Sequence, residues 1–256
     1  MVIITYRKKK VAVTQLWFAA DMAAGQQVKT DILFFHGMPF KAADRDCLST
    51  EFHTLISNLS ESEETLFSKI NKNVRYEIRR NCKETAEYKT FTSKELAEQP
   101  EVTEQFADMY ELMYWEKGVK AAFNMTQFKA YMKEEAIMLT AIYEGGRPLV
   151  FHSYIVGEEQ VRLLHSVSDF RSGEVDANLV ARANKRLHWE DMLLFQKEGR
   201  RSYDWGGVSS LENPNGIDAF KFKFGGEPLT YYNVYKGKSW LGKMAVFVMK
   251  KRMGKK

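Results

Sequence analysis

The chain has 256 residues, of which 45% are apolar and 28% are charged. This is the composition of a globular protein with an ample core, and it excludes disordered, collagen-like and disulfide-scaffold classes. No run of about 18 apolar residues occurs, so the sequence predicts no membrane-spanning helix. Two cysteines, Cys47 and Cys82, form no CxxC pair, which argues against structural zinc and for a reducing, cytoplasmic compartment.

The net charge of +5 is unevenly distributed along the chain. Residues 236–256 contain eight basic residues and no acidic one, so residues 1–235 carry a net charge of −3. Basic tails bind anionic partners such as a membrane surface or tRNA. Apolar residues with helical spacing predict an amphipathic helix in this tail: Trp240, Leu241, Met244, Phe247 and Val248. The alternative is a helix docked on the body of the protein, with a frayed lysine end.

Three β-rich runs open the chain and predict strands: residues 2–6, 11–18 and 28–36. The basic Arg7–Lys10 run is better explained by a turn between the first two strands than by a signal peptide. Ser60–Glu63 then has the form of a capping box. It precedes apolar residues that recur every four positions and predict one long helix ending near residues 83–87: Leu66, Ile70, Val74 and Ile78.

A cationic stripe runs along the same predicted helix. Lys72, Arg75 and Arg79 lie at spacings of three and four, with few acidic residues between them. A charge run of this kind is usually a solvated face. The functional alternative is that the stripe binds the diphosphate of a nucleotide-linked or lipid-linked acceptor.

The middle of the chain changes from helices to strands. Beyond Pro100, helical spacing predicts one helix through Phe106, Met109 and Met113, and a shorter one follows through residues 128–132. Three strand-like runs separated at hairpin distance then predict an antiparallel meander: residues 137–143, 149–156 and 160–167.

A loop beginning at Asp169 leads to a helix expected from Asn184 to Glu198. Asn184 is a suitable N-cap, and Gly199 stands where a helix ends. A short strand at residues 203–205, a glycine loop and a final strand at residues 229–235 complete the pattern. This order predicts an α+β fold with one mixed sheet.

Four sequence blocks resemble the Fem-type branch of the GNAT N-acyltransferase superfamily. In chain order they are Arg75–Arg80, Arg182–Asp191, Tyr203–Gly207 and Phe220–Gly226, the last with the F-K-x-x-F-G pattern. The resemblance spans about residues 66–235 and implies a GNAT-like mixed, mostly antiparallel sheet flanked by helices. It also implies three parts: an abbreviated N-terminal GNAT-like module with the basic helix at 1–98, an acyltransferase module at 99–235, and a basic amphipathic tail at 236–256.

Fem-type proteins are N-acyltransferases. Founding members transfer amino acids from aminoacyl-tRNA to peptidoglycan precursors, whereas relatives use acyl-CoA donors on amino sugars or other amines. This chain has room for only one full module and lacks a long helical-hairpin insertion. The resemblance therefore implies an N-acyltransferase that moves an acyl group from acyl-CoA to an amine of a sugar or cell-envelope precursor.

Two alternatives remain open. One is an aminoacyl-tRNA-dependent transferase that acts on a peptidoglycan precursor. The other is a non-catalytic membrane-binding or polyanion-binding protein on a GNAT scaffold. The expected location is cytoplasmic, and the tail at residues 236–256 would allow peripheral attachment to the inner membrane face.

Amide formation needs a neutral amine, a positioned donor carbonyl and a stabilised oxyanion, but no Ser-His-Asp triad. The resemblance assigns the lysine of the last block to Lys221, whose cation could stabilise an oxyanion or hold a donor phosphate. The alternative is a solvated lysine, as expected of Lys223. Asp204 and Asp169 are candidate bases. An aspartate before glycines, as at Asp204, also caps turns routinely.

Arg182 and Asn184, at the predicted helix start, are candidates for binding the phosphates or pantetheine of acyl-CoA. The alternative is an N-cap beside a surface arginine. Only Arg171–Gly173 hints at the usual GNAT phosphate loop. The remaining candidates are Phe220 and Gly225 for the donor, and His188, Trp205, Gly206 and Gly207 for the acceptor.

Each of these residues also has a structural interpretation. A histidine on an inner helix turn is more often a hydrogen-bonded structural group than a titrating one, which applies to His188. Trp205 suits a core position or a pocket wall, and the glycines serve backbone geometry first. No residue cluster with metal-ligand spacing occurs, so no metal is predicted.

Overall fold

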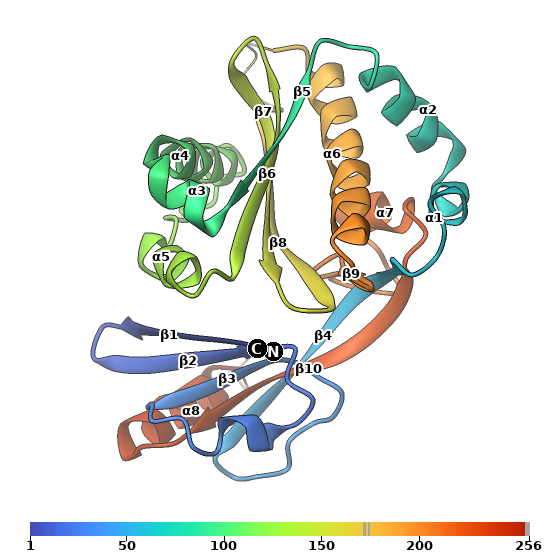
Figure 1. The fold of residues 1–256 in the computed structure, drawn as a ribbon. Coiled ribbons are helices and arrows are strands. Elements are labelled where there is room, and N and C mark those ends of the chain that lie inside the picture. The colour runs from blue at the N-terminus through green and yellow to red at the C-terminus, as the bar shows by residue number, and fades with distance from the viewer. Residues whose placement is uncertain (171–172, 174, 254–256) are drawn as a thin grey trace. The chain divides into compact units, whose positions relative to one another are not determined.

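The computed structural model describes residues 1–170, 173 and 175–253. The chain forms two compact units, whose elements are labelled in Figure 1. The first contains Met1–Thr54, Gly207–Asn213 and Pro228–Lys256, and the second contains Leu55–Gly206 and Pro214–Glu227. This division differs from the predicted boundaries after residues 98 and 235, because the chain leaves the first unit at Thr54 and returns to it twice.

Five strands follow one another across the sheet of the first unit in the order β1, β2, β3, β10, β4. Their bounds are Val2–Lys8, Val11–Trp17, Ile32–Met38, Glu227–Gly237 and Cys47–Asn58. β1 and β2 form an antiparallel hairpin, β2 runs parallel to β3, and β3 runs antiparallel to β10. A short 3-10 helix, Met22–Gly25, lies between β2 and β3. Each of the three runs predicted as strands at the N-terminus does contain a strand, although the third begins at Ile32 instead of residue 28, and β4 was not predicted.

The sheet of the second unit continues from the end of β4 through β9, β8, β7 and β6 to β5. The bounds are β5 Glu87–Thr92, β6 Ile137–Glu144, β7 Arg147–Val156, β8 Gln160–Ser168 and β9 Ser202–Asp204. The antiparallel meander β6–β7–β8 is confirmed, and only β9 runs parallel to its neighbour β8. The sheets are thus mixed and mostly antiparallel, as predicted.

Helices cover both faces of this second sheet. α6 packs on one face, and α3, α4 and α5 pack on the other, which explains why β6 and β7 are buried almost throughout (Figure 1). The helices of the second unit are α1 Glu63–Lys69, α2 Lys72–Asn81, α3 Ser93–Glu98, α4 Pro100–Glu116, α5 Met125–Lys133, α6 Ala177–Lys197 and α7 Gly216–Phe222.

Two helix predictions are wrong. The long helix predicted after Ser60–Glu63 is two helices, because Asn71 caps α2 and its backbone N–H donates to the Lys223 carbonyl at 2.8 Å. Ser62, rather than Ser60, caps α1. The helix predicted to begin at Asn184 begins at Ala177, with Asp176 as its N-cap, so residue 184 lies about two turns inside α6.

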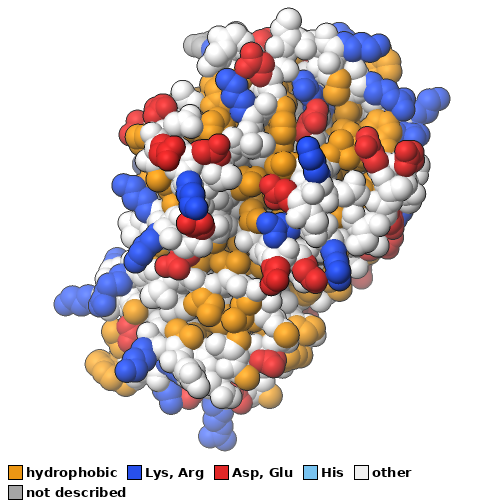
Figure 2. Space-filling view, in the orientation of Figure 1, with side chains coloured by type: hydrophobic (Ala, Val, Ile, Leu, Met, Phe, Trp, Pro, Cys, Tyr) orange, Lys and Arg blue, Asp and Glu red, His pale blue; other side chains and the backbone are white. Residues whose placement is uncertain are grey.

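Charged side chains are spread over the surface. On the face in Figure 2, basic and acidic side chains are interspersed. Within the described part of the chain, no helix combines the length and the apolar composition needed to cross a membrane.

Candidate active site

A cavity of about 450 Å³ lies in the second unit between α6, α7, β8 and the end of α4. Its described apolar lining consists of Met113, Leu163, Phe170, Val180, Ala181, Ile217 and Phe220. Gly216 and seven polar residues complete the described lining: Lys117, Ser166, Ser168, Asn184, Lys185, His188 and Lys221. No acidic residue is among these described lining residues, so the cavity suits an apolar or anionic group.

The cavity exists because β8 and β9 separate. They pair only from Gln160 to Arg162, after which β9 ends at Asp204. The chain then turns at Gly206, whose φ is 69° and where a Cβ would lie 2.5 Å from the Leu163 carbonyl oxygen. Only glycine fits this turn. Beyond Leu163 the edge of β8 therefore faces α6 and α7 instead of another strand.

Lys221 reaches this cavity from the last turn of α7. The helix is set by a capping box in which Asn215 accepts from the backbone of Asp218, and Asp218 accepts from the backbone of Asn215. Burial lowers the pKa of Lys221 from 10.5 to about 8, opposed by the carboxylates of Asp204 and Asp218 and reinforced by Arg162. The ammonium is thus held at a position where its charge is poorly solvated.

The two candidate bases lie at different places. Asp204 is buried, forms an ion pair with Arg162 at 3.6 Å and accepts the Gly206 N–H at 2.8 Å. It is therefore both a turn cap and a counter-charge near Lys221. Asp169 pairs with Arg147 at 2.5 Å and lines a separate cavity of about 140 Å³ beside Met109 and Met113.

A buried polar network centred on Asp191 supports the cavity wall. Its carboxylate accepts from the Tyr154 hydroxyl at 2.6 Å and the Tyr88 hydroxyl at 3.1 Å, and it pairs with His152 Nδ1 at 2.8 Å. The Tyr154 hydroxyl also contacts that of Tyr203 at 2.8 Å. Burial and the nearby Asp191 charge raise the pKa of Tyr154 and of Tyr203 well above the usual range.

This network ends on two residues of the cavity wall. His152 Nε2 lies 2.9 Å from Asn184 Oδ1, and His188 Nδ1 lies 3.1 Å from the Tyr203 hydroxyl. Burial, with His152 and Lys221 nearby, lowers the pKa of His188 well below its usual value. His188 is therefore neutral at neutral pH. His188 is therefore a buried, hydrogen-bonded histidine, as the structural interpretation of its sequence position suggested.

The sequence prediction missed this network. Asn184, His188 and Asp191 follow one another at spacings of four and three, which places them on one face of α6. That spacing was the available signal. The partners His152 and Tyr154 come from β7, whose pattern is that of an apolar buried strand.

Of the other residues predicted to bind the donor, some line the cavity and some do not. Phe220 lines it, but Arg182 is buried in an ion pair with Glu84 at 2.7 Å and does not. Gly225 has a φ of 76°, and a Cβ there would lie 2.7 Å from the Lys69 carbonyl oxygen. Gly225 thus allows a close backbone approach. Arg171 and Ser172, which hinted at a phosphate loop, lie outside the described residues.

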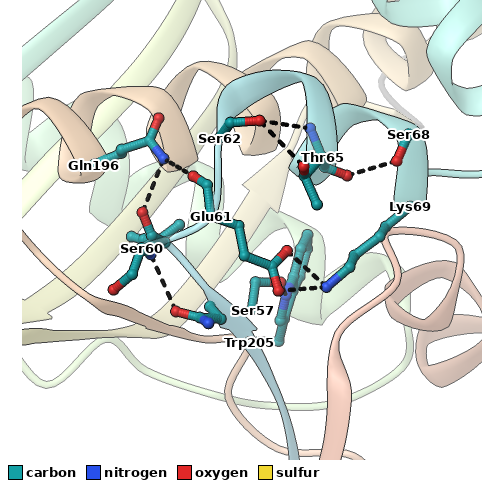
Figure 3. A network of polar contacts seen from close by, with 11 residues as sticks. Ser57, Ser60, Glu61, Ser62, Thr65, Ser68, Lys69, Gln196 and Trp205 are labelled. Atoms are coloured by element: carbon teal, nitrogen blue, oxygen red, sulfur yellow. Dashed lines mark hydrogen bonds and ion pairs between the residues drawn. The ribbon is translucent and has the colours of Figure 1, made fainter.

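The residues predicted to bind the acceptor also lie at different places in the structure. Trp205 is fully buried behind His188, with ring centroids 4.8 Å apart, and its indole N–H donates to Ser57 Oγ at 2.9 Å (Figure 3). Gly206 forms the turn described above. Gly207 belongs to the first unit and approaches the Phe52 ring, since a Cβ at this position would lie 3.4 Å from it.

The cationic stripe lies on α2, which packs against α6. None of Lys72, Arg75 and Arg79 is among the described residues that line the cavity. The Arg79 guanidinium lies 4.9 Å from the Phe67 ring centroid. The stripe is therefore a surface separate from the cavity wall.

Polar contacts fix the segment that leads into α1 and α2 (Figure 3). Gln196, near the end of α6, donates to the carbonyls of Leu59 and Glu61 at 2.8 and 2.7 Å. Glu61 in turn pairs with Lys69 at 2.6 Å. Since Gly225 packs on Lys69, these contacts also support the chain that follows α7. Among the described residues, no group of three or more His, Cys, Asp or Glu side chains is placed to hold a metal ion.

No family model matches the sequence, and no curated protein matches it. Solved structures do match. The C-terminal DUF2156 domain of a protein assigned as a lysylphosphatidylglycerol synthetase from Agrobacterium fabrum gives a TM-score of 0.60 at 13% identity, over 96% of this chain and 83% of that one. FemX gives a TM-score of 0.60 at 11% identity, over 91% and 83% of the two chains.

L-PGS from Bacillus licheniformis gives a TM-score of 0.51 at 11% identity, over 99% of this chain and 86% of that one. At these identities the likeness concerns the fold alone. The chain has a Fem/GNAT-like fold, as the sequence blocks predicted.

Proposed function

We propose that this protein is an N-acyltransferase whose reaction takes place at the Lys221 cavity. The observation that carries the proposal is a poorly solvated ammonium, with its pKa lowered to about 8, at the wall of a largely apolar cavity of about 450 Å³. A cation in such a place stabilises negative charge strongly, because little water competes with it.

In the proposed step a neutral amine of the acceptor attacks the donor carbonyl carbon, and a C–N bond forms. The carbonyl oxygen becomes an oxyanion, which Lys221 stabilises. Collapse of this intermediate breaks the bond to the leaving group, a thiolate if the donor is a thioester. The amine proton passes to water or to Asp204. Because Asp204 already holds Arg162 and the Gly206 N–H, its first role is to keep Lys221 charged.

The proposed donor is acyl-CoA. The cavity has lysines but no acid among its described lining residues, and the described part of the chain contains no long inserted helical hairpin. The helix start expected to bind the CoA phosphates does not exist at Asn184, since α6 begins at Ala177. The exposed Lys117 at the cavity is instead the proposed phosphate partner.

Aminoacyl-tRNA is the second candidate donor. The observation in its favour is the fold shared with FemX and L-PGS, since the Fem-type branch that the sequence blocks resemble includes aminoacyl-tRNA-dependent members. The ester of an aminoacyl-tRNA undergoes the same attack, with a ribose oxygen as the leaving group. Its acceptor would be a peptidoglycan precursor.

For the acceptor we propose an amine of a sugar or cell-envelope precursor, free or lipid-linked. Lys72, Arg75 and Arg79 on α2 are proposed to bind the diphosphate of such a carrier. Arg75 is half-buried and Arg79 is exposed. Variants with glutamine at these positions should raise the KM for a diphosphate-bearing acceptor and leave the KM for a short amine unchanged.

The test is an acyl-transfer assay with purified protein, using acyl-CoAs of increasing length and aminoacyl-tRNAs as donors, and nucleotide-linked amino sugars as acceptors. Lys221→Ala should lower kcat/KM by roughly a hundredfold, the usual cost of losing one oxyanion-stabilising group. Lys223→Ala, two residues away and exposed, is the matched control and should retain activity. Full activity of Lys221→Ala would refute the role. The non-catalytic alternative would follow if no donor were used and none raised the melting temperature.

A further inference from the structure

The helix α8, Trp240–Met253, presents a row of large apolar side chains to solvent. Trp240 is 73% exposed, Met244 and Phe247 are each 55% exposed, and Val248 is 46% exposed. At about 100° per residue, these four positions fall within roughly one third of the helix circumference. We call them the apolar stripe of α8.

The apolar stripe is not the surface that attaches α8 to the first unit. The opposite side does so: Gly242 and Val246 are buried, and a Cβ on Gly242 would collide with the Asp31 carbonyl oxygen. Ser239 caps the helix by accepting the Gly242 N–H at 3.1 Å, and its hydroxyl donates to Asp31 at 2.6 Å. The helix is therefore held with its apolar stripe outward. The docked helix considered from the sequence does occur, but it docks through residues outside the predicted apolar set.

Basic side chains accompany the apolar stripe. Residues 236–253 contain no acidic residue. Lys243 pairs with Asp46 at 2.8 Å, and Lys250 donates to a backbone carbonyl. Lys251 lies along the stripe, with its ammonium 4.6 Å from the Phe247 ring centroid. Lys251 and Arg252 have no acidic side chain within ion-pair distance among the described residues, so their charge is available to an external anion.

We propose that α8 binds an anionic membrane surface. The apolar stripe would enter the boundary between headgroups and acyl chains, and Lys251 and Arg252 would lie against lipid phosphates. Exposed Trp and Phe beside Lys and Arg is the composition suited to that boundary, where one end of a side chain is apolar and the other is wet. A second copy of the chain is a poorer occupant, because two such helices would bring like charges together.

This inference does not rest on acyl transfer, because binding to vesicles needs no donor or acceptor. It bears on the proposed function in one respect: a protein bound in this way would meet lipid-linked acceptors rather than free ones.

The test is co-sedimentation of the full chain with phosphatidylcholine vesicles, and with vesicles of equal parts phosphatidylglycerol and phosphatidylcholine. We expect binding to the anionic vesicles only, weakened by salt. Replacing Lys251 and Arg252 by glutamine should lower the partition coefficient about fivefold for each charge removed. Trp240→Ser combined with Phe247→Ser should lower it by roughly tenfold or more. Trp115→Ser is the control, since Trp115 on α4 is 72% exposed and belongs to the second unit.

A second readout uses a variant that preserves the apolar character of the helix. The fluorescence of Trp240, obtained as the difference between the wild-type protein and Trp240→Phe, should shift to shorter wavelength on anionic vesicles. The proposal would be overturned if the wild-type protein did not bind anionic vesicles. It would also be overturned if the Trp240→Ser/Phe247→Ser variant bound them as strongly as the wild-type protein. A dimer in sedimentation velocity that the double variant converts to monomer, while no vesicle binding occurs, would overturn it as well.

Discussion

The charge of Lys221 is expected to destabilise the fold that holds it. Burial lowers the pKa of this lysine from 10.5 to about 8. Each pKa unit corresponds to about 1.4 kcal/mol between the two protonation states, so the charged form costs roughly 3 kcal/mol at neutral pH. Lys221→Met keeps most of the stem and removes the charge. Because the lysine side chain retains some contact with water, its real cost is smaller than this value, and we expect Lys221→Met to raise the free energy of unfolding by about 2 kcal/mol.

The pH dependence has a definite sign. Below about pH 8 the lysine is charged in both the folded and the unfolded chain, and the full penalty applies. Between about pH 8 and 10.5 the folded protein releases its proton while the unfolded chain still holds one, so the wild-type protein gains stability relative to the variant. The stability gap between Lys221→Met and wild type should therefore be widest at neutral pH and close by pH 10.5.

Urea unfolding of both proteins across this pH range measures the gap directly. Lys223→Met is the matched control: it removes an exposed lysine two residues away, and its stability should stay within about 0.5 kcal/mol of wild type at every pH. If Lys221→Met were instead less stable than Lys223→Met at neutral pH, the lysine would be holding the fold together and the reasoning would fail. A gap that did not narrow with rising pH would refute it equally.

Three further predictions concern Lys221 and residues that support the structure around its cavity. The rate of acyl transfer should fall above about pH 8, where Lys221 loses its proton. In a pH–rate profile of Lys221→Arg this decrease should occur at higher pH, whatever the effect of the substitution on the maximal rate. Gly225→Ala should cost about 2 kcal/mol in thermal unfolding, because φ is 76° and the new Cβ would lie 2.7 Å from the Lys69 carbonyl oxygen; Gly216→Ala, with open space around it, should not. Asp191→Asn should lower the free energy of unfolding in urea by about 3 kcal/mol, because it replaces a buried carboxylate that is bonded to two tyrosines and to His152. Glu190→Gln is the control.

Much of the fold was predictable because its signals are local. The meander β6–β7–β8 follows from three apolar runs at hairpin distance, and the four buried positions from Leu66 to Ile78 follow from their spacing. The block that contains Lys221 was recognised by its pattern, and this residue lies at the cavity. Its catalytic role stays a prediction.

The wrongly predicted helix boundaries lie where the neighbouring sequence allows more than one helix start and a contact with a distant residue accompanies the one that is used. Asp176 and Asn184 are both good N-caps, and nothing nearby says that Arg182 will be buried against Glu84 inside the helix. Asn71 ends a helical pattern by capping α2 with its side chain, while its backbone N–H donates to the distant Lys223 carbonyl. The neighbouring residues offer more than one possible cap, and the distant contacts that accompany the cap actually used cannot be read from them.

The buried network explains why the rest of the site was the least predictable part. His152 and Tyr154 lie in the buried part of β7, where polar groups are costly unless they are fully bonded. They are bonded, to Asp191 and through it to the side of α6 that carries Asn184 and His188. The cavity wall is therefore fixed from behind by groups that never touch it. Lys221 lines the same cavity as Asn184 and His188. A poorly solvated ammonium beside polar groups that are already held in place would stabilise a developing charge with little reorganisation, which is the role proposed for Lys221.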